Sequence, residues 1–159
     1  MNALRLGIAL LSLTVTAGCD PVLKPYATPF NEAELLPYAR AGTAVIAGKA
    51  VTQTRRGEVD FPPGSTVVLM PLTVYTIELL ERGIIRGEKI SAPNYTLENY
   101  VRRTVTGAQG NFWFSGLPAG SYLLIAAKAT ADGEGTVNDM AYTTTAVMDS
   151  ELKTVILTR

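Results

Sequence analysis

The chain has 159 residues, 47% of them hydrophobic, and its 14 basic residues are balanced by 14 acidic residues. This length leaves room for one domain with short appendages, and the apolar content argues against wholesale disorder. The balanced charge lacks the basic footprint of a nucleic-acid-binding protein, so no nucleic-acid partner is expected.

Two residue types limit the chemistry. The sequence has no histidine, which removes the usual general base near neutral pH and the commonest metal ligand. Its one cysteine can form neither an intrachain disulfide nor a cysteine metal cluster. We therefore expect no enzyme activity, no catalytic residues, no cofactor and no metal site.

The N-terminus has the pattern of an export signal. One basic residue precedes an apolar run that ends near Thr16, roughly the 7–15 residues of a signal-peptide core and too short to span a bilayer. The small residues Ala17 and Gly18 lead directly into Cys19. This segment resembles the lipobox of bacterial lipoproteins, although Thr16 stands where leucine is usual. The resemblance implies removal of residues 1–18 and attachment of palmitate-type lipid at Cys19. The alternative is an ordinary signal peptide with an incidental cysteine.

Residues 19–41 have the composition of a tether. Prolines at this density hold a chain extended at about 3.1 Å per residue, which predicts a spacer between the lipid and a domain at 42–159. A short helical turn is expected at Asn31–Leu36, because Glu34 lies three residues after a possible Asn31 cap. Alternatively, the aromatic residues of this segment dock on the domain or on a partner. They are Tyr26, Phe30 and Tyr38.

From Gly42 onward the pattern is that of an all-β domain. Short β-branched and apolar runs separated by turn residues are typical of a β-sandwich. They predict seven strands, at Thr43–Ala50, Thr66–Leu72, Val101–Thr106, Asn111–Ser115, Tyr122–Thr130, Ala141–Met148 and Lys153–Thr158.

One stretch of the domain has helical periodicity instead. Between residues 77 and 84 the apolar residues recur at i, i+3 and i+7, and Glu78 can pair with Arg82 one turn later. The pattern predicts a short amphipathic helix with a possible stop at Gly83. Residues 85–100 are expected to be an irregular insertion that closes the helix back onto the sheet.

The clearest motif lies between residues 107 and 122. It reads Gly-x-Phe-x-Phe and then Leu-Pro-x-Gly-x-Tyr, formed by Gly110, Phe112, Phe114, Leu117, Pro118, Gly120 and Tyr122. This motif resembles the signature of carboxypeptidase regulatory-like domains, which are transthyretin-like (prealbumin-like) sandwiches. The resemblance covers about residues 43–159, interrupted at 73–100, and implies a seven-stranded sandwich of that kind. Phe112 and Phe114 alternate, so both are expected in the core. The motif identifies a fold and no chemistry.

The same region supplies a candidate binding face. If strands 101–106 and 111–115 form a hairpin in which Gly107 pairs with Gly110, Thr104 faces Trp113 and Arg102 lies diagonal to it. Trp113 would then point away from the core and could stack on a sugar ring or a partner's side chain. The alternative is that the insertion at 73–100 covers Trp113 in a second small core.

These patterns favour a non-catalytic lipoprotein of the bacterial cell envelope, facing the periplasm, on either the inner or the outer membrane. It would contact the membrane through its lipid anchor and bind another envelope protein. The alternative function is binding of carbohydrate or cell wall through the aromatic face. The acidic residues Asp132, Glu134 and Asp139 could gather around Ca²⁺, but their spacing fits no EF-hand loop, and an exposed acidic turn is the simpler interpretation.

Overall fold

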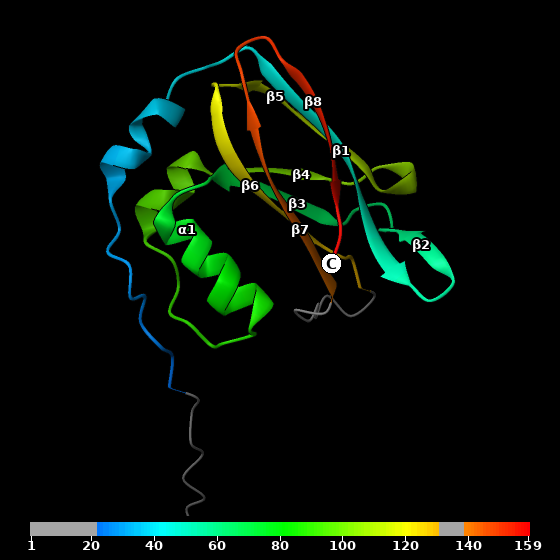
Figure 1. Ribbon diagram of the computed structural model, residues 1–159, viewed down its shortest axis with the longest axis horizontal. Coiled ribbons are helices and arrows are strands. Elements are labelled where there is room, and N and C mark those ends of the chain that lie inside the picture. The colour runs from blue at the N-terminus through cyan, green and yellow to red at the C-terminus, as the bar shows by residue number, and fades with distance from the viewer. Residues whose placement is uncertain (1–21, 131–138) are drawn as a thin grey trace, which may run out of the picture.

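In the computed structural model, residues 22–130 and 139–159 are described, and their eight strands form a β-sandwich with a helical layer on one side (Figure 1). The expected all-β sandwich with one short helix is confirmed, with one strand more than predicted. The signal peptide, Cys19, Asp132 and Glu134 lie outside the described residues.

The first sheet is built around one long strand, β1 (Ala44–Thr54). Its first half pairs antiparallel with β5 (Asn111–Leu117) and parallel with β8 (Leu152–Leu157). Its second half turns back into β2 (Gly57–Asp60). The strand β2 was not predicted, because its residues are largely exposed and show no alternation of apolar and polar side chains.

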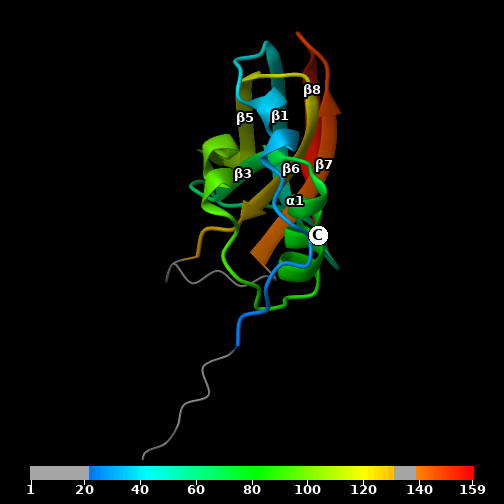
Figure 2. The same ribbon diagram turned by 90° about the vertical axis from the view of Figure 1, so that its left-hand side faces the viewer.

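The second sheet has the order β4-β3-β6-β7, and all neighbours in it are antiparallel. It consists of β3 (Thr66–Pro71), β4 (Arg102–Val105), β6 (Gly120–Ala127) and β7 (Met140–Val147). Figure 2 shows the same elements from a direction at right angles to that of Figure 1.

Strand β6 is apolar on both faces because both faces are covered. Tyr122 and Leu124 point into the core between the sheets, whereas Leu123 and Ile125 point outward into a second apolar cluster. A strand buried on both sides has a nearly continuous apolar sequence, as this one does.

A short helical layer covers the outer face of the second sheet. The helix α1 (Val74–Glu78) continues as a π-helical turn at Leu79–Ile85, and Leu80 and Ile84 pack on the sheet. The expected amphipathic helix is therefore present, but it does not stop at Gly83. Two short 3₁₀ turns of the N-terminal segment, Glu32–Glu34 and Leu36–Tyr38, complete the layer together with a third at Tyr95–Tyr100.

The N-terminal segment, residues 22–41, is docked on the domain. Leu35 is 1% exposed and packs with Tyr75 and Leu97, and the ring of Tyr26 stacks on Tyr75 with centroids 4.3 Å apart. Figures 1 and 2 both show the segment (blue) running beside the helical insertion (green). The extended spacer expected here is wrong for residues 22–41, and the alternative, docking of the aromatic residues, is what the structure shows. The expected helical turn is present, since Asn31 caps Glu32–Glu34.

The predicted hairpin between β4 and β5 is also wrong, because the two strands belong to different sheets. At the end of β4, Thr106 donates a hydrogen bond from Oγ1 to the carbonyl of Pro62, which holds it on the loop before β3 (2.7 Å). At the start of β5, Gly110 has φ +70° and lies so close to β1 that a Cβ would stand 2.6 Å from the Ala50 carbonyl oxygen. The end of β4 is thus attached beside the second sheet and the start of β5 to the first sheet, so the two strands part at the turn that joins them.

Candidate functional site

The residues of the Gly110–Tyr122 motif serve the fold. Phe112, Phe114, Leu117 and Tyr122 are all buried in the core between the sheets, as expected from the alternation and the turn chemistry. The Tyr122 hydroxyl donates to the carbonyl of Pro118 at 2.8 Å and so closes the turn from β5 to β6. None of these four side chains is available to a ligand, so any binding surface lies elsewhere.

Trp113 lies on the outer face of the first sheet, and its side chain is 69% exposed. It stands opposite Ala47 of β1, which in turn stands beside Thr154 of β8. The small side chain of Ala47 offers the indole little cover. The helical insertion packs on the other sheet, so the alternative in which it covers Trp113 is wrong.

A shallow depression of about 550 Å³ surrounds this indole. Its lining is mainly apolar and comes from three strands: Ala47, Gly48 and Lys49 of β1, Asn111, Phe112 and Trp113 of β5, and Thr154, Val155 and Ile156 of β8. We call the outward-pointing part of this surface, formed by Lys49, Asn111, Trp113, Thr154 and Ile156, the Trp113 face.

Polar groups flank the indole on this face. Lys49 forms an ion pair with Asp60 of β2 (2.6 Å), which holds its ammonium group at the edge of the depression. Asn111 pairs with Lys49 across the sheet, and its side chain is exposed. The face thus combines a flat aromatic ring with hydrogen-bonding groups, the arrangement with which proteins bind amphipathic ligands.

Sequence reasoning left open whether Trp113 is exposed or covered, and it misplaced the neighbours of the indole. Thr104 pairs with Val67 in the second sheet and does not face Trp113. Arg102 reaches across the edge of the sandwich and donates from Nη1 to the carbonyl of Ser115 (3.0 Å), which ties β4 to β5. The residues that do adjoin the indole come from β1 and β8. Their parallel pairing joins segments about 100 residues apart, and nothing in the local sequence indicates it.

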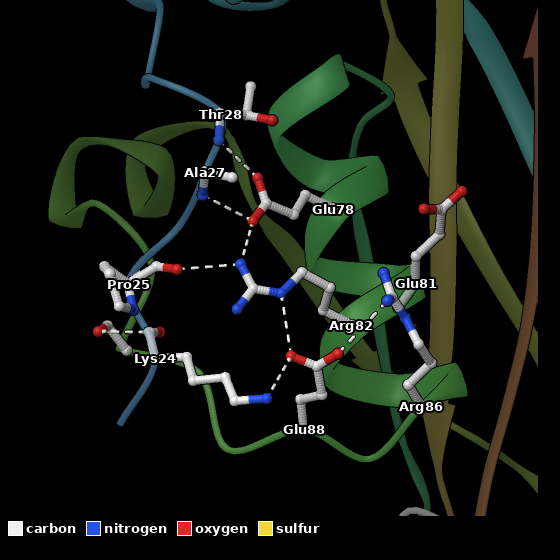
Figure 3. Close-up of polar contacts among 10 residues, drawn as sticks. Lys24, Pro25, Ala27, Thr28, Glu78, Glu81, Arg82, Arg86 and Glu88 are labelled. Carbon is white, nitrogen blue, oxygen red and sulfur yellow. Dashed lines mark hydrogen bonds and ion pairs between the residues drawn. The ribbon is translucent and has the colours of Figure 1, made fainter. Parts of the chain in front are cut away.

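A second polar cluster fastens the N-terminal segment to α1 (Figure 3). The carboxylate of Glu78 accepts hydrogen bonds from the backbone N–H groups of Ala27 (2.8 Å) and Thr28 (2.7 Å). Arg82 pairs with Glu78, as the sequence predicted, and also donates to the carbonyl of Pro25 (2.9 Å). We call this set of contacts the N-terminal clamp.

The clamp continues to the end of the helical turn. The carboxylate of Glu88 forms ion pairs with Lys24 (3.4 Å), Arg82 (3.2 Å) and Arg86 (3.4 Å). The backbone N–H of Ala27 is the main reason that the pKa of Glu78 falls to about 2, from an ordinary value of 4.5. Both carboxylates are therefore charged at neutral pH, and they hold the segment through charge-assisted hydrogen bonds.

The described residues offer no arrangement for metal chemistry. Within residues 22–130 and 139–159, His, Cys, Asp and Glu side chains form no group of three or more that could hold a metal ion. None of the helices in this part of the chain has the length and apolar content that a membrane span requires.

The architecture defines the chain as a two-sheet β-sandwich with a helical layer. Among solved structures, it is similar to one from Pseudomonas aeruginosa described as "a putative carbohydrate binding protein (PA1324)", with a TM-score of 0.68 and 22% identity over 83% of this chain and 99% of that one. It also matches the minor pilin GBS52 of Streptococcus agalactiae, at 21% identity over 72% of this chain and 50% of that one, with a TM-score of 0.44. No protein-family model matches the sequence, and no curated protein is significantly similar to it. At these identities the likeness to the Pseudomonas structure shows a shared fold.

Proposed function

We propose that this chain is a lipid-anchored protein of the bacterial cell envelope and that its sandwich is a non-catalytic binding module. The observation that carries the proposal is the exposed indole of Trp113 on an uncovered sheet face. Aromatic side chains held rigidly on a sheet are enriched at binding hot spots, because ordering them on binding costs little conformational entropy. The absence of histidine from the sequence supports a role without catalysis.

The ligand of first choice is another protein of the envelope. The depression at the Trp113 face is shallow and lined mainly by apolar atoms, and Ile156 within the face is 56% exposed. Such a surface suits a partner's apolar side chains, with Lys49 and Asn111 as its polar rim.

Carbohydrate is the second candidate. The flat indole can stack on a sugar ring, and the side chains of Asn111 and Thr154 can hydrogen-bond to hydroxyl groups. The description of the Pseudomonas protein as a putative carbohydrate-binding protein also favours this candidate.

One pair of variants tests the face, and two binding assays distinguish the two ligands. Trp113→Ala should abolish capture of the ligand, whereas Tyr95→Ala, which removes an aromatic ring 86% exposed on the insertion, should leave capture unchanged. In-cell cross-linking followed by mass spectrometry detects a protein partner, and binding to purified glycans and peptidoglycan fragments detects a carbohydrate. Unchanged capture by a folded Trp113→Ala protein would remove this face as the binding site.

The anchor is proposed from the lipobox resemblance at Thr16–Cys19. More than one acyl chain is needed for stable attachment, and the processed cysteine of a lipoprotein supplies them. Labelled palmitate should enter the wild-type protein and not the Cys19→Ala variant. Label retained by Cys19→Ala would contradict the proposal.

We also propose membership of the carboxypeptidase regulatory-like domains, on the residues of the Gly110–Tyr122 motif. The support is that its Phe112, Phe114, Leu117 and Tyr122 side chains all occupy the core that such a motif requires.

A further inference from the structure

The docked N-terminal segment leaves a short path between the lipid-bearing cysteine and the folded domain. Among the described residues, which begin at Val22, Lys24 is the first held by backbone hydrogen bonds: its N–H donates to the Lys89 carbonyl (2.9 Å), and its own carbonyl accepts from the Ser91 N–H (2.9 Å). From Lys24 onward the chain is held by the N-terminal clamp and by the burial of Leu35.

The reach of this path follows from backbone geometry. Lys24 is five positions after Cys19, and five extended residue steps span at most about 18 Å. A spacer that ran to residue 41 would instead span about 70 Å in an extended conformation. A lipid on Cys19 would therefore hold the domain against the bilayer and not above it.

The surface around this point has the composition of a membrane-contacting patch. Three aliphatic side chains are exposed there: Val22 (88%), Leu23 (55%) and Ile85 (47%). Three exposed basic residues accompany them, namely Lys24, Arg86 and Lys89. Lys24 and Arg86 share the carboxylate of Glu88, and Lys24 bonds to the backbone of Lys89, so these residues are neighbours. We call this set the membrane-proximal patch.

We propose that the membrane-proximal patch lies on the anionic surface of the membrane that carries the anchor, an inference that rests on the proposed lipidation of Cys19. The aliphatic side chains enter the interface, and the long basic side chains extend their charges to lipid phosphates. Glu88 opposes this attraction only in part, because its side chain is 20% exposed while those of Lys24 and Arg86 are 63% and 57% exposed. Basic groups this close to an anionic surface are attracted to it.

The consequence is a fixed orientation. In Figure 1 the first described residues lie at the opposite end of the molecule from the turn between β7 and β8, which contains Met148. If the patch rests on the membrane, this turn points away from it.

Fluorescence quenching in proteoliposomes tests the orientation. The chain has no cysteine besides Cys19, whose sulfur is consumed by the lipid thioether, so an introduced cysteine is the sole free thiol. Ile85→Cys places a bimane label in the patch, and Met148→Cys, at a site 75% exposed, is the matched control at the far end. The purified lipidated proteins are reconstituted with phosphatidylglycerol and phosphatidylethanolamine that contain doxyl-labelled lipid.

We expect the label at position 85 to lose about half its emission or more, because a side chain in the interface lies within about 5–10 Å of the acyl chains, and the label at position 148 to lose almost none. Adding Glu78→Gln, which weakens the clamp, should reduce quenching at position 85. Equal quenching at both positions, or none at position 85, would overturn the inference. Mass spectrometry of Cys19 shows which proposal has failed. A lipidated protein without quenching at position 85 refutes the orientation alone. An unlipidated Cys19 refutes both the anchor and the orientation.

Discussion

Phe112 and Trp113 are adjacent in β5 and face opposite sides of the sheet, so their alanine variants test the register of that strand. Phe112 is 2% exposed and belongs to the core between the sheets, whereas Trp113 is 69% exposed. The two substitutions remove large aromatic rings from consecutive positions, and only the burial differs.

The structure sets the size of each effect. The Phe112 ring fills the space above Gly48, where a Cβ would come within 2.5 Å of the Phe112 Cζ atom, and it contacts Phe114 edge-on with centroids 6.0 Å apart. Neighbouring atoms cannot close the resulting cavity without moving β1, so Phe112→Ala should cost about 3–5 kcal/mol. Trp113→Ala leaves no cavity and should change the free energy of unfolding by less than about 1 kcal/mol.

Urea denaturation of residues 20–159, which lack the proposed lipid-bearing cysteine, measures both values. The midpoint should fall strongly for Phe112→Ala with the slope unchanged, and it should stay close to the wild-type value for Trp113→Ala. A Trp113→Ala loss as large as that of Phe112→Ala would refute the assignment of Trp113 to an open face and, with it, the proposed binding site.

Further predictions concern the docked N-terminal segment. Leu35→Ala removes a side chain that is 1% exposed and should reduce the free energy of docking of the segment by about 2–5 kcal/mol. Proteases should then cut the segment at concentrations that leave the sandwich intact. Tyr38→Phe removes the hydroxyl that donates to the Ser121 carbonyl and accepts from its N–H, both at 3.1 Å, and should cost about 1 kcal/mol in urea denaturation. The pKa of Glu78 lies at about 2, below its ordinary 4.5, so its contribution to docking is complete above about pH 4.5 and is lost as the pH falls through about 2. The amide proton shifts of Ala27 and Thr28 should report that titration by NMR, and a midpoint near 4.5 would show that the carboxylate is not held by these N–H groups.

The sequence predicted the parts of the fold that depend on local chemistry. Alternation placed Phe112 and Phe114 in the core, and the glycine and proline residues of the motif marked its turns. The helix at residues 74–85 followed from its apolar spacing and from the Glu78–Arg82 pair. Each of these signals lies within a few residues of the element that it specifies, so no knowledge of distant partners was needed.

The candidate binding face was predicted only in part, because its geometry depends on long-range pairing. That Trp113 points away from the core follows from the burial of Phe112 beside it, but its exposure also depends on which sheet face the helical insertion covers. The neighbours of Trp113 depend on which strand pairs with β5, and there local sequence favoured β4 over β1. Two glycine-bracketed strands close in sequence are typical of a hairpin. Here Thr106 and Gly110 make contacts beside different sheets, so β4 and β5 do not pair.

The N-terminal segment shows how one sequence signal supports two opposite structures. Its prolines favour an extended chain, and an extended chain can be either a free spacer or a strap docked on a surface. Proline also reduces the entropy that the unfolded segment loses on docking, so the same residues lower the cost of the docked state. Glu78 stabilises the docked state. With the segment in place its side chain is largely buried, and a buried carboxylate needs hydrogen-bond partners to remain charged. The guanidinium of Arg82 and the N–H groups of Ala27 and Thr28 are those partners, and the two N–H groups are available only when the segment is docked.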